Sequence, residues 1–185
     1  QQGTGHAVQQ AVPVLPDDGM VLVLSGDVPL TQVVTLQGLI AATGGDKLAL
    51  LTIDFANPTG YGRIVRKDGV ADGAVGAVMA IVEQKDATAS QKQITEIYSG
   101  IMAVPAKLLK GWLVRLDNKN VQGEYYLTDI VKFAVADGMT VVAHKINDAA
   151  QVAGVNSPVQ LAELERTFQL RQAQHFMEQG VRIAD

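Results

Sequence analysis

Apolar, strand-like runs alternate with helix-like segments along this chain, and no other feature of the sequence constrains its fold as strongly. The two clearest apolar runs cover residues 20–24 and 47–55, and a helix-like segment separates them. Apolar runs of this length predict strands that are buried on both faces. Strands that alternate with helices predict an α/β fold with a mixed, mostly parallel sheet.

Spacing and turn signals predict the remaining elements. The run at residues 20–24 is expected to be a central strand, and further strands are expected over residues 63–66, 78–83, 94–104 and 140–143. Helices are expected over residues 6–15, 31–42 with Thr31 as N-cap, 105–116, 123–136 and from Ser157 onward. The last helix is expected to bury the side marked by Leu161, Leu164, Phe168, Leu170 and Phe176. The glycine-rich stretch of residues 69–80 predicts an excursion at the sheet edge.

Composition excludes several classes of protein. A chain of 185 residues that is 48% hydrophobic and 18% charged folds around a core, as one domain or as a large lobe of a bigger protein. The chain has no cysteine, which excludes disulfide scaffolds, zinc–thiolate sites and cysteine nucleophiles, and fits a reducing, cytoplasmic compartment. A net charge of −4 argues against nucleic-acid partners. Neither a signal peptide nor an apolar run long enough to cross a membrane is expected.

The first strand ends in Ser25, Gly26 and Asp27, and this is the strongest local signal of a site. Ligands of open α/β sheets bind at the carboxyl ends of strands. The glycine allows close approach of a phosphate, and the carboxylate of Asp27 suits a magnesium ion that bridges phosphates. Taken alone, Asp27 fits a turn cap beside Pro29 equally well.

Other candidates are weaker when each is taken alone. Gly3 and Thr4 precede a predicted helix in an ordinary-looking glycine-rich loop, and Glu83 fits a sugar-hydroxyl acceptor or a surface charge cluster. Asn156 fits either a turn residue or a second metal ligand beside Asp27. The segment that contains Tyr126 fits either a ligand contact or packing.

Six motifs in a fixed order make a more specific pattern than any of them alone. They are GTGHA (3–7), SGDVPL (25–30), NPTGYGRI (57–64), IVEQKDA (81–87), QGEYYLTD (122–129) and GVN (154–156). This order resembles the bacterial N-acetylglucosamine-1-phosphate uridyltransferases, and more closely the bifunctional enzymes that also acetylate glucosamine-1-phosphate. The resemblance covers almost the whole chain and favours the functional interpretation of each motif.

The resemblance implies a Rossmann-like nucleotide-diphospho-sugar transferase fold with Mg²⁺ as cofactor. Asp27, as the catalytic residue, and Asn156 would hold the metal. Gly3, Thr4, Ser25, Gly26 and Asp27 would bind the nucleotide. Gly62, Glu83, Tyr98, Tyr126, Thr128 and Asn156 would line the sugar side. Tyr98 stands where the family usually has asparagine, so the contact at this position differs from the family pattern.

The resemblance also implies substrates and partners. UTP and N-acetylglucosamine-1-phosphate would give UDP-N-acetylglucosamine and pyrophosphate, for peptidoglycan, lipopolysaccharide and cell-wall synthesis in the cytoplasm. The parent protein would be a homotrimer through a β-helix domain.

The expected boundaries are a partial uridyltransferase domain over residues 1–179 and the start of a linker to a left-handed β-helix over residues 180–185. The family's first strand and its glycine-rich signature loop with a lysine belong upstream of residue 1, so this chain alone is expected to be weakly active or inactive. The open alternatives are a pyrophosphorylase for another sugar-1-phosphate and a non-catalytic module that binds nucleotide sugars.

Overall fold

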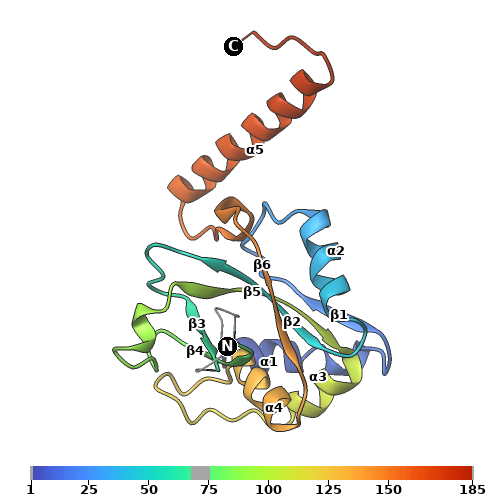
Figure 1. The fold of residues 1–185 in the computed structure, drawn as a ribbon, viewed down its shortest axis with the longest axis vertical. Coiled ribbons are helices and arrows are strands. Elements are labelled where there is room, and N and C mark those ends of the chain that lie inside the picture. The colour runs from blue at the N-terminus through green and yellow to red at the C-terminus, as the bar shows by residue number, and fades with distance from the viewer. Residues whose placement is uncertain (1, 68–75, 185) are drawn as a thin grey trace.

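A twisted mixed sheet with helices on both faces forms the body of the protein (Figure 1). The computed structural model describes residues 2–67 and 76–184. The strands are β1 (Met20–Val23), β2 (Leu48–Asp54), β3 (Gly62–Arg66), β4 (Val78–Val82), β5 (Glu96–Pro105) and β6 (Val141–Lys145). The α-helices are α1 (Thr4–Gln9), α2 (Val33–Ala42), α3 (Ala106–Leu113), α4 (Ile130–Ala136) and α5 (Pro158–Glu178). Short 3₁₀ turns include η1 (Val12–Val14), η4 (Leu127–Asp129) and η5 (Ala149–Val152).

Strand directions confirm a mixed sheet but correct the expectation that most strands are parallel. The sheet order is β4-β3-β5-β2-β6, with β1 paired to β5, and of the recorded pairings only β2 with β6 is parallel. The reason is the position of β5, which runs opposite to each of its neighbours β1, β2 and β3. Alternation of strands and helices identifies the fold class, but it does not determine which way each strand runs.

Strand β5 has a forked edge. Along one side it pairs with β2, and along the other side it pairs first with β3 and then with β1. The β3 pairs end at Tyr98 and the β1 pairs begin at Met102, so the two partners diverge around Gly100. The expectation of a buried central strand over residues 20–24 is therefore wrong. β1 pairs with β5 alone among the described strands, and its side chains contact both core clusters. It is half-buried because its other side has no strand partner in the described part of the chain.

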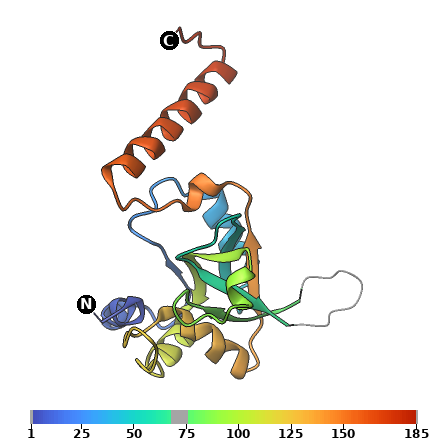
Figure 2. The ribbon, with the colours of Figure 1, turned by 90° about the vertical axis from the view of Figure 1, so that its left-hand side faces the viewer.

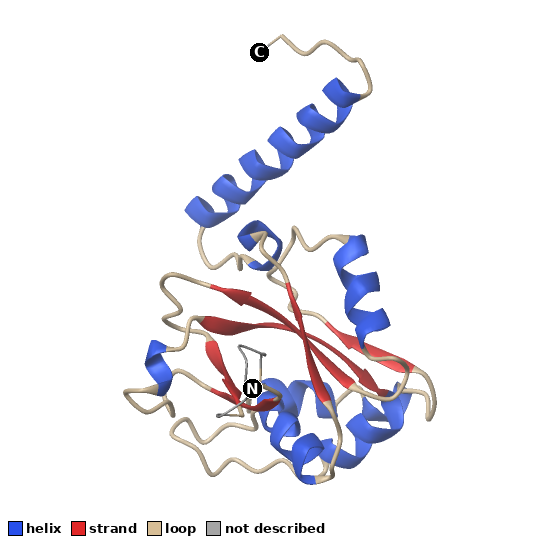
Figure 3. Ribbon diagram, in the orientation of Figure 1, coloured by secondary structure: helices blue, strands red, loops and turns tan. Residues whose placement is uncertain are grey.

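Two apolar clusters form the core, one on each face of the sheet. The larger cluster joins β5 and β2 to α3 and α4 and includes Leu109, Trp112 and Ile130. The smaller cluster packs Leu39 of α2 against the opposite face of the same strands. Figure 3 shows this arrangement, with α1, α3 and α4 gathered at one side of the sheet and α2 at the other.

Helix α5 stands away from the sheet, which corrects the expected burial of its apolar side (Figure 2). Leu164 is buried, whereas Leu161, Phe168, Leu170 and Phe176 are all exposed. Helical spacing of apolar residues defines a face, but it does not say what covers that face. Within residues 2–67 and 76–184, nothing covers it.

Three other expected elements differ from the structure. The helix expected over residues 123–136 is only η4 followed by α4, and the one expected over residues 6–15 is α1 followed by η1. Helix α2 is capped at Gln32 without a side-chain bond, because the hydroxyl of Thr31 donates instead to the main-chain oxygen of Gln151. Of the expected excursion over residues 69–80, residues 69–75 lie outside the described part of the chain. Its far end belongs to β4, which pairs with β3.

No helix in the described part of the chain is both long and apolar enough to cross a membrane.

Glu96 is a buried carboxylate in β5 that joins three strands. Its two oxygens accept hydrogen bonds from Nε and Nη2 of Arg66, both at 2.7 Å, and Oε1 also accepts one from Thr52 Oγ1 at 2.9 Å. Burial by itself raises the pKa of a carboxyl group, but the bonds from Arg66 and Thr52 outweigh that effect, and the pKa of Glu96 lies below its usual value.

Glu96→Gln is therefore expected to lower the free energy of unfolding by about 2 kcal/mol at neutral pH. Because the folded-state pKa is depressed, the contribution of Glu96 is present above the unfolded-state pKa and is lost as pH falls through the folded-state value. Urea denaturation at about pH 7 and about pH 4 should show the difference between wild type and variant narrowing in acid. Asp54→Asn, which removes a half-exposed ion pair with Lys145 in the adjacent strand, is the control and should cost less than about 1 kcal/mol. A difference that does not change with pH would contradict the assignment.

Candidate active site

A cavity of about 850 Å³ lies at the fork of the sheet, between the end of β1 and the start of β3. Nine of the expected site residues line it. They are Thr4, Ser25, Gly26, Asp27, Gly62, Glu83, Tyr98, Thr128 and Asn156. These residues come from segments far apart in the sequence, so the fold brings together what the motifs only listed in order.

Gly3 and Tyr126 do not line this cavity. A Cβ built on Gly3 would lie 2.7 Å from the main-chain oxygen of Tyr125, so this glycine allows the N-terminal segment to pack against residues 124–125. Tyr126 instead lines a smaller neighbouring cavity of about 140 Å³ together with Asp86, and it shares Glu83 and Thr128 with the main cavity. Direct ligand contacts by Gly3 and Tyr126 therefore remain predictions from the resemblance.

Asp27 and Asn156 converge on Gly154 at one end of the cavity. A Cβ built on Gly154 would lie 3.3 Å from Asp27 Oδ2 and 3.7 Å from Asn156 Nδ2. The two loops that carry these residues are joined directly, because the main-chain N–H of Val155 donates to the main-chain oxygen of Asp27 at 2.8 Å. Glycine at position 154 keeps open the space between the carboxylate and the amide.

This donor set fits Mg²⁺. Among residues 2–67 and 76–184, no group of three or more His, Cys, Asp or Glu side chains is placed to hold a metal ion. Mg²⁺ in phosphoryl-transfer sites is commonly held by one or two carboxylates, with waters and substrate phosphates completing the shell. Asp27 supplies a carboxylate, and the amide of Asn156, turned over, presents Oδ1 to the same space. The neighbourhood of Gly154 is thus suited to a cation that is bound together with phosphates.

Tyr98 of β5, Gly62 of β3 and Glu83, the residue after β4, lie at the other end of the cavity. Gly62 of β3 is the register partner of Tyr98 in β5, and a Cβ built on Gly62 would lie 3.6 Å from Glu83 Oε2. The same Cβ would lie 2.8 Å from Ile81 Cγ2, so glycine at position 62 allows close packing against β4 beside the carboxylate. We call the part of the cavity that is lined by Gly62, Glu83 and Tyr98 the polar recess.

Thr128 holds the carboxylate of this recess in place. Its Oγ1 donates to Glu83 Oε1 at 2.9 Å from the adjacent η4 turn. Burial raises the pKa of Glu83, and the bond from Thr128 offsets this only in part. Glu83 lines the cavity, where its carboxylate can accept a hydrogen bond from a ligand hydroxyl or N–H.

The N-terminal segment closes one wall of the cavity. Thr4 Oγ1 accepts a hydrogen bond from the main-chain N–H of Leu127 at 3.1 Å, and Gly5 N–H donates to Tyr125 O at 2.7 Å. Across the fork, Ser25 Oγ lies 3.5 Å from the main-chain oxygen of Gly100. Gly100 has φ +89°, which a side chain rarely adopts, and a Cβ there would clash with the hydroxyl of Ser25.

Ser99, Gly100 and Gly154 also line the cavity, although the sequence did not single them out as site residues. Gly154 lies within the GVN motif, so its neighbour Asn156 was the available signal. Gly100 is one glycine among 18, and nothing in its local sequence marks it.

Curated proteins of similar sequence match this chain over its whole length. No family model matches the chain. The "Bifunctional protein GlmU" of Albidiferax ferrireducens is 74% identical over all 185 residues, and that of Polaromonas sp. is 71% identical over 186 aligned positions. The GlmU of Methylibium petroleiphilum is 56% identical over 185 residues. The whole chain is similar to one part of GlmU.

The chain spans 38% of the Albidiferax GlmU and 40% of the Methylibium GlmU. The resemblance found from the six motifs is thereby confirmed at the level of sequence similarity.

Solved structures give the fold independently. A UDP-glucose pyrophosphorylase bound to UDP-glucose matches with a TM-score of 0.67 and 13% identity, over 92% of this chain and 63% of that one. A putative glucose-1-phosphate thymidylyltransferase from Bacillus anthracis matches with a TM-score of 0.61 and 15% identity, over 89% of this chain and 60% of that one. The α/β nucleotidyltransferase fold is therefore confirmed, as a mixed sheet that is largely antiparallel within the described residues.

The hydroxyl of Tyr98 gives a testable property of the site. Tyr98 is 8% exposed, and its Oη has no hydrogen-bond partner among the described residues. Burial raises the pKa of the phenol, so the hydroxyl keeps its proton and remains a donor. Because a buried, unpaired hydroxyl is costly, Tyr98→Phe is expected to raise the ligand-free free energy of unfolding by about 1 kcal/mol.

Urea denaturation of the ligand-free protein measures this effect. Tyr125→Phe, at a half-buried tyrosine outside the cavity, is the control and should change stability by less than about 0.5 kcal/mol. A loss of stability in Tyr98→Phe would show that the hydroxyl has a partner in the ligand-free protein.

Proposed function

We propose that the chain is the nucleotidyltransferase region of a UDP-N-acetylglucosamine pyrophosphorylase, which converts UTP and N-acetylglucosamine-1-phosphate into UDP-N-acetylglucosamine and pyrophosphate. The convergence of Asp27 and Asn156 on Gly154 carries the proposal, since it places a metal-type donor pair at one end of a cavity whose other end is a polar recess. The similarity to GlmU supports the choice of uridyl transfer over other reactions of this fold.

The reaction balances without a protein nucleophile. An oxygen of the sugar-1-phosphate attacks the α-phosphorus of UTP, a new P–O–P bond forms, and the bond to the β-phosphate breaks to release pyrophosphate. A sugar phosphate is already ionised at neutral pH, so a general base is not needed, and catalysis depends on positioning and on charge neutralisation. Mg²⁺ held by Asp27 and Asn156 would neutralise phosphate charge during this transfer.

The chain's own residues divide the remaining work. Gly26 allows phosphate oxygens to approach the turn after β1, where Asp27 and Ser25 are presented. Thr4 lines the wall that we assign to the nucleotide, and Gly3 allows this segment to pack against residues 124–125. Glu83, held by Thr128, accepts from hydroxyl or amide groups of the sugar, while Tyr98 and Gly62 shape the recess around them.

Several properties of the parent protein belong to the same proposal. Residues 180–185 would begin a linker to a β-helix acetyltransferase domain, through which the parent protein would form a homotrimer. The proposed reaction would take place in the cytoplasm. Its product would enter peptidoglycan and lipopolysaccharide synthesis.

Asp27→Asn tests the metal-binding role. In the full-length protein that carries these residues, Mg²⁺-dependent release of pyrophosphate should fall by at least about 100-fold, because the amide removes the only carboxylate at the Gly154 end of the described cavity. Asp18→Asn, in the exposed turn before β1, is the matched control and should retain wild-type turnover. Equal pyrophosphate release by Asp27→Asn and wild type would overturn the assignment of the metal site.

Sugar selectivity tests the polar recess. N-acetylglucosamine-1-phosphate should be used with a kcat/KM at least about 10-fold above that of glucose-1-phosphate, because buried polar groups discriminate against ligands that leave them unpaired. Both rates are measured by pyrophosphate release under the same Mg²⁺ concentration. Equal kcat/KM values for the two sugars would instead indicate a pyrophosphorylase of broader or different sugar specificity.

A further inference from the structure

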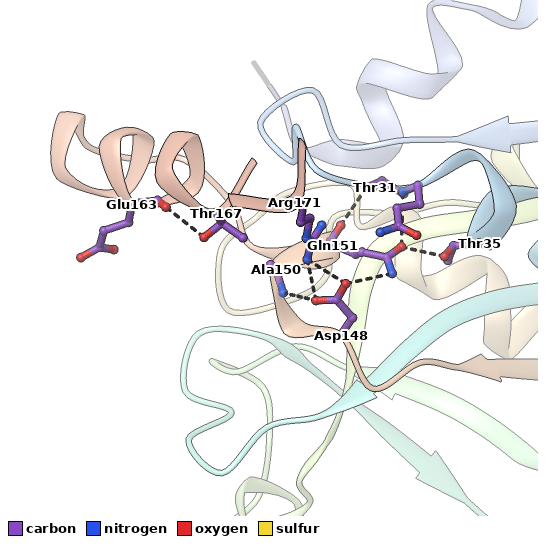
Figure 4. Close-up of polar contacts among 9 residues, drawn as sticks. Thr31, Thr35, Asp148, Ala150, Gln151, Glu163, Thr167 and Arg171 are labelled. Carbon is purple, nitrogen blue, oxygen red and sulfur yellow. Dashed lines mark hydrogen bonds and ion pairs between the residues drawn. The ribbon is translucent and has the colours of Figure 1, made fainter. Parts of the chain in front are cut away.

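The side chain of Gln151 joins two segments of the chain that are far apart in sequence (Figure 4). Its Oε1 accepts hydrogen bonds from Thr35 Oγ1 at 2.6 Å and from the main-chain N–H of Gln32 at 3.3 Å. Its Nε2 donates to Asp148 Oδ2 at 3.2 Å. The first turn of α2 and the start of η5 therefore meet at one amide group.

This amide is buried and well satisfied. Gln151 is 7% exposed and Thr35 is 8% exposed. The donors of α2 face the oxygen and the carboxylate of Asp148 faces the nitrogen, so the partners fix which way the amide points. Buried polar groups of this kind lose much of their stabilisation when one partner is removed, because the other is left without a hydrogen bond.

Hydrogen bonds connect this network to the loops that carry Asp27 and Asn156. Thr31 follows Asp27 by four residues, and its Oγ1 donates a hydrogen bond to the main-chain oxygen of Gln151 at 2.8 Å. On the other side, Val155 N–H donates to Asp27 O at 2.8 Å, one residue before Asn156. Residues 151 and 155, on either side of residues 152–154, are thus hydrogen-bonded to Thr31 and to Asp27, respectively.

Helix α5 is attached to the same network. Asp148 accepts Ala150 N–H at 3.2 Å, and both of its carboxylate oxygens accept from Arg171 Nη2, at 2.9 and 2.8 Å. At the start of α5, the main-chain N–H of Asn156 donates to Gln160 Oε1 at 2.7 Å. The position of Asn156 is therefore linked to α2 through Gln151 and to α5 through Gln160.

We propose that Gln151 is a positioning residue for the metal site. By anchoring η5 to the first turn of α2, its side chain fixes the start of the loop that leads to Asn156, and so holds the amide of Asn156 at the distance from the carboxylate of Asp27 that a divalent cation requires. Groups that orient metal ligands from outside the coordination shell commonly change metal affinity by about 10- to 100-fold when they are removed. This inference rests on the proposed function, because it takes Asp27 and Asn156 as the metal ligands.

The test measures metal binding rather than turnover. Mg²⁺ is titrated by calorimetry into the full-length protein saturated with UDP-N-acetylglucosamine, after the affinity for that nucleotide sugar has been measured in the presence of EDTA. Thr35→Val removes one donor to Gln151 while keeping the shape of the side chain, and Gln151→Met removes both ends of the network. Both variants should bind Mg²⁺ about 10-fold or more weakly, and their metal-free affinity for the nucleotide sugar should stay within about twofold of wild type.

Two further variants separate positioning from general stability. Thr35→Ser restores the hydroxyl and should restore Mg²⁺ affinity. Thr43→Val removes another buried hydroxyl, at the far end of α2, and should leave Mg²⁺ affinity unchanged. There Oγ1 donates to Ile40 O at 2.7 Å and accepts from Gly45 N–H at 3.1 Å.

The outcomes separate the two proposals. Wild-type Mg²⁺ affinity in Thr35→Val, or the same loss in Thr35→Val and Thr43→Val, would overturn the positioning role. If Gln151→Met does not fold, the comparison of the threonine variants decides. A wild-type protein that binds UDP-N-acetylglucosamine but no Mg²⁺ would overturn the proposed metal site itself.

Discussion

The pairing of β5 with three strands is the constraint on which the rest of the structure depends. β2 runs along one side of β5, while β3 and β1 divide the other side between them. Because β3 and β1 diverge around Gly100, the sheet opens at the point where the turn after β1 delivers Asp27. The cavity is therefore a consequence of strand pairing, and its two ends belong to different branches of the fork.

Two groups in the cavity reduce stability in the ligand-free protein. Glu83 is a carboxylate whose burial opposes its ionisation, and the hydroxyl of Tyr98 is buried without a partner among the described residues. Such features are typical of binding sites, where groups that are unsatisfied in the free protein find their partners in the ligand. The structural core, by contrast, pairs its buried carboxylate Glu96 fully.

Local sequence predicted the elements and most of the cavity, but not their burial or direction. The apolar runs at β2 and β5 were strong enough to identify as strands, and the ordered motifs located nine residues that line one cavity. The apolar run of β1 suggested a central strand, because apolarity reports burial and does not report which strands are neighbours. The prediction that the apolar side of α5 is buried was wrong for the same reason. Gln151 and Gly100 were missed because their roles depend on contacts over 119 and 75 positions of sequence, respectively.

Helix α5 is attached to the rest of the protein close to the candidate metal site. Asn156 lies at its N-terminal end, and Arg171, 13 residues after Pro158 and so about 20 Å along the axis, ties it to Asp148. Helix α5 thus begins beside a candidate metal ligand, is attached to Asp148 through Arg171, and carries exposed apolar side chains along its length. The Arg171–Asp148 ion pair is partly exposed, so salt weakens it, whereas the hydrogen bonds of the Gln151 amide are buried. Higher ionic strength would therefore loosen the attachment of α5 to Asp148.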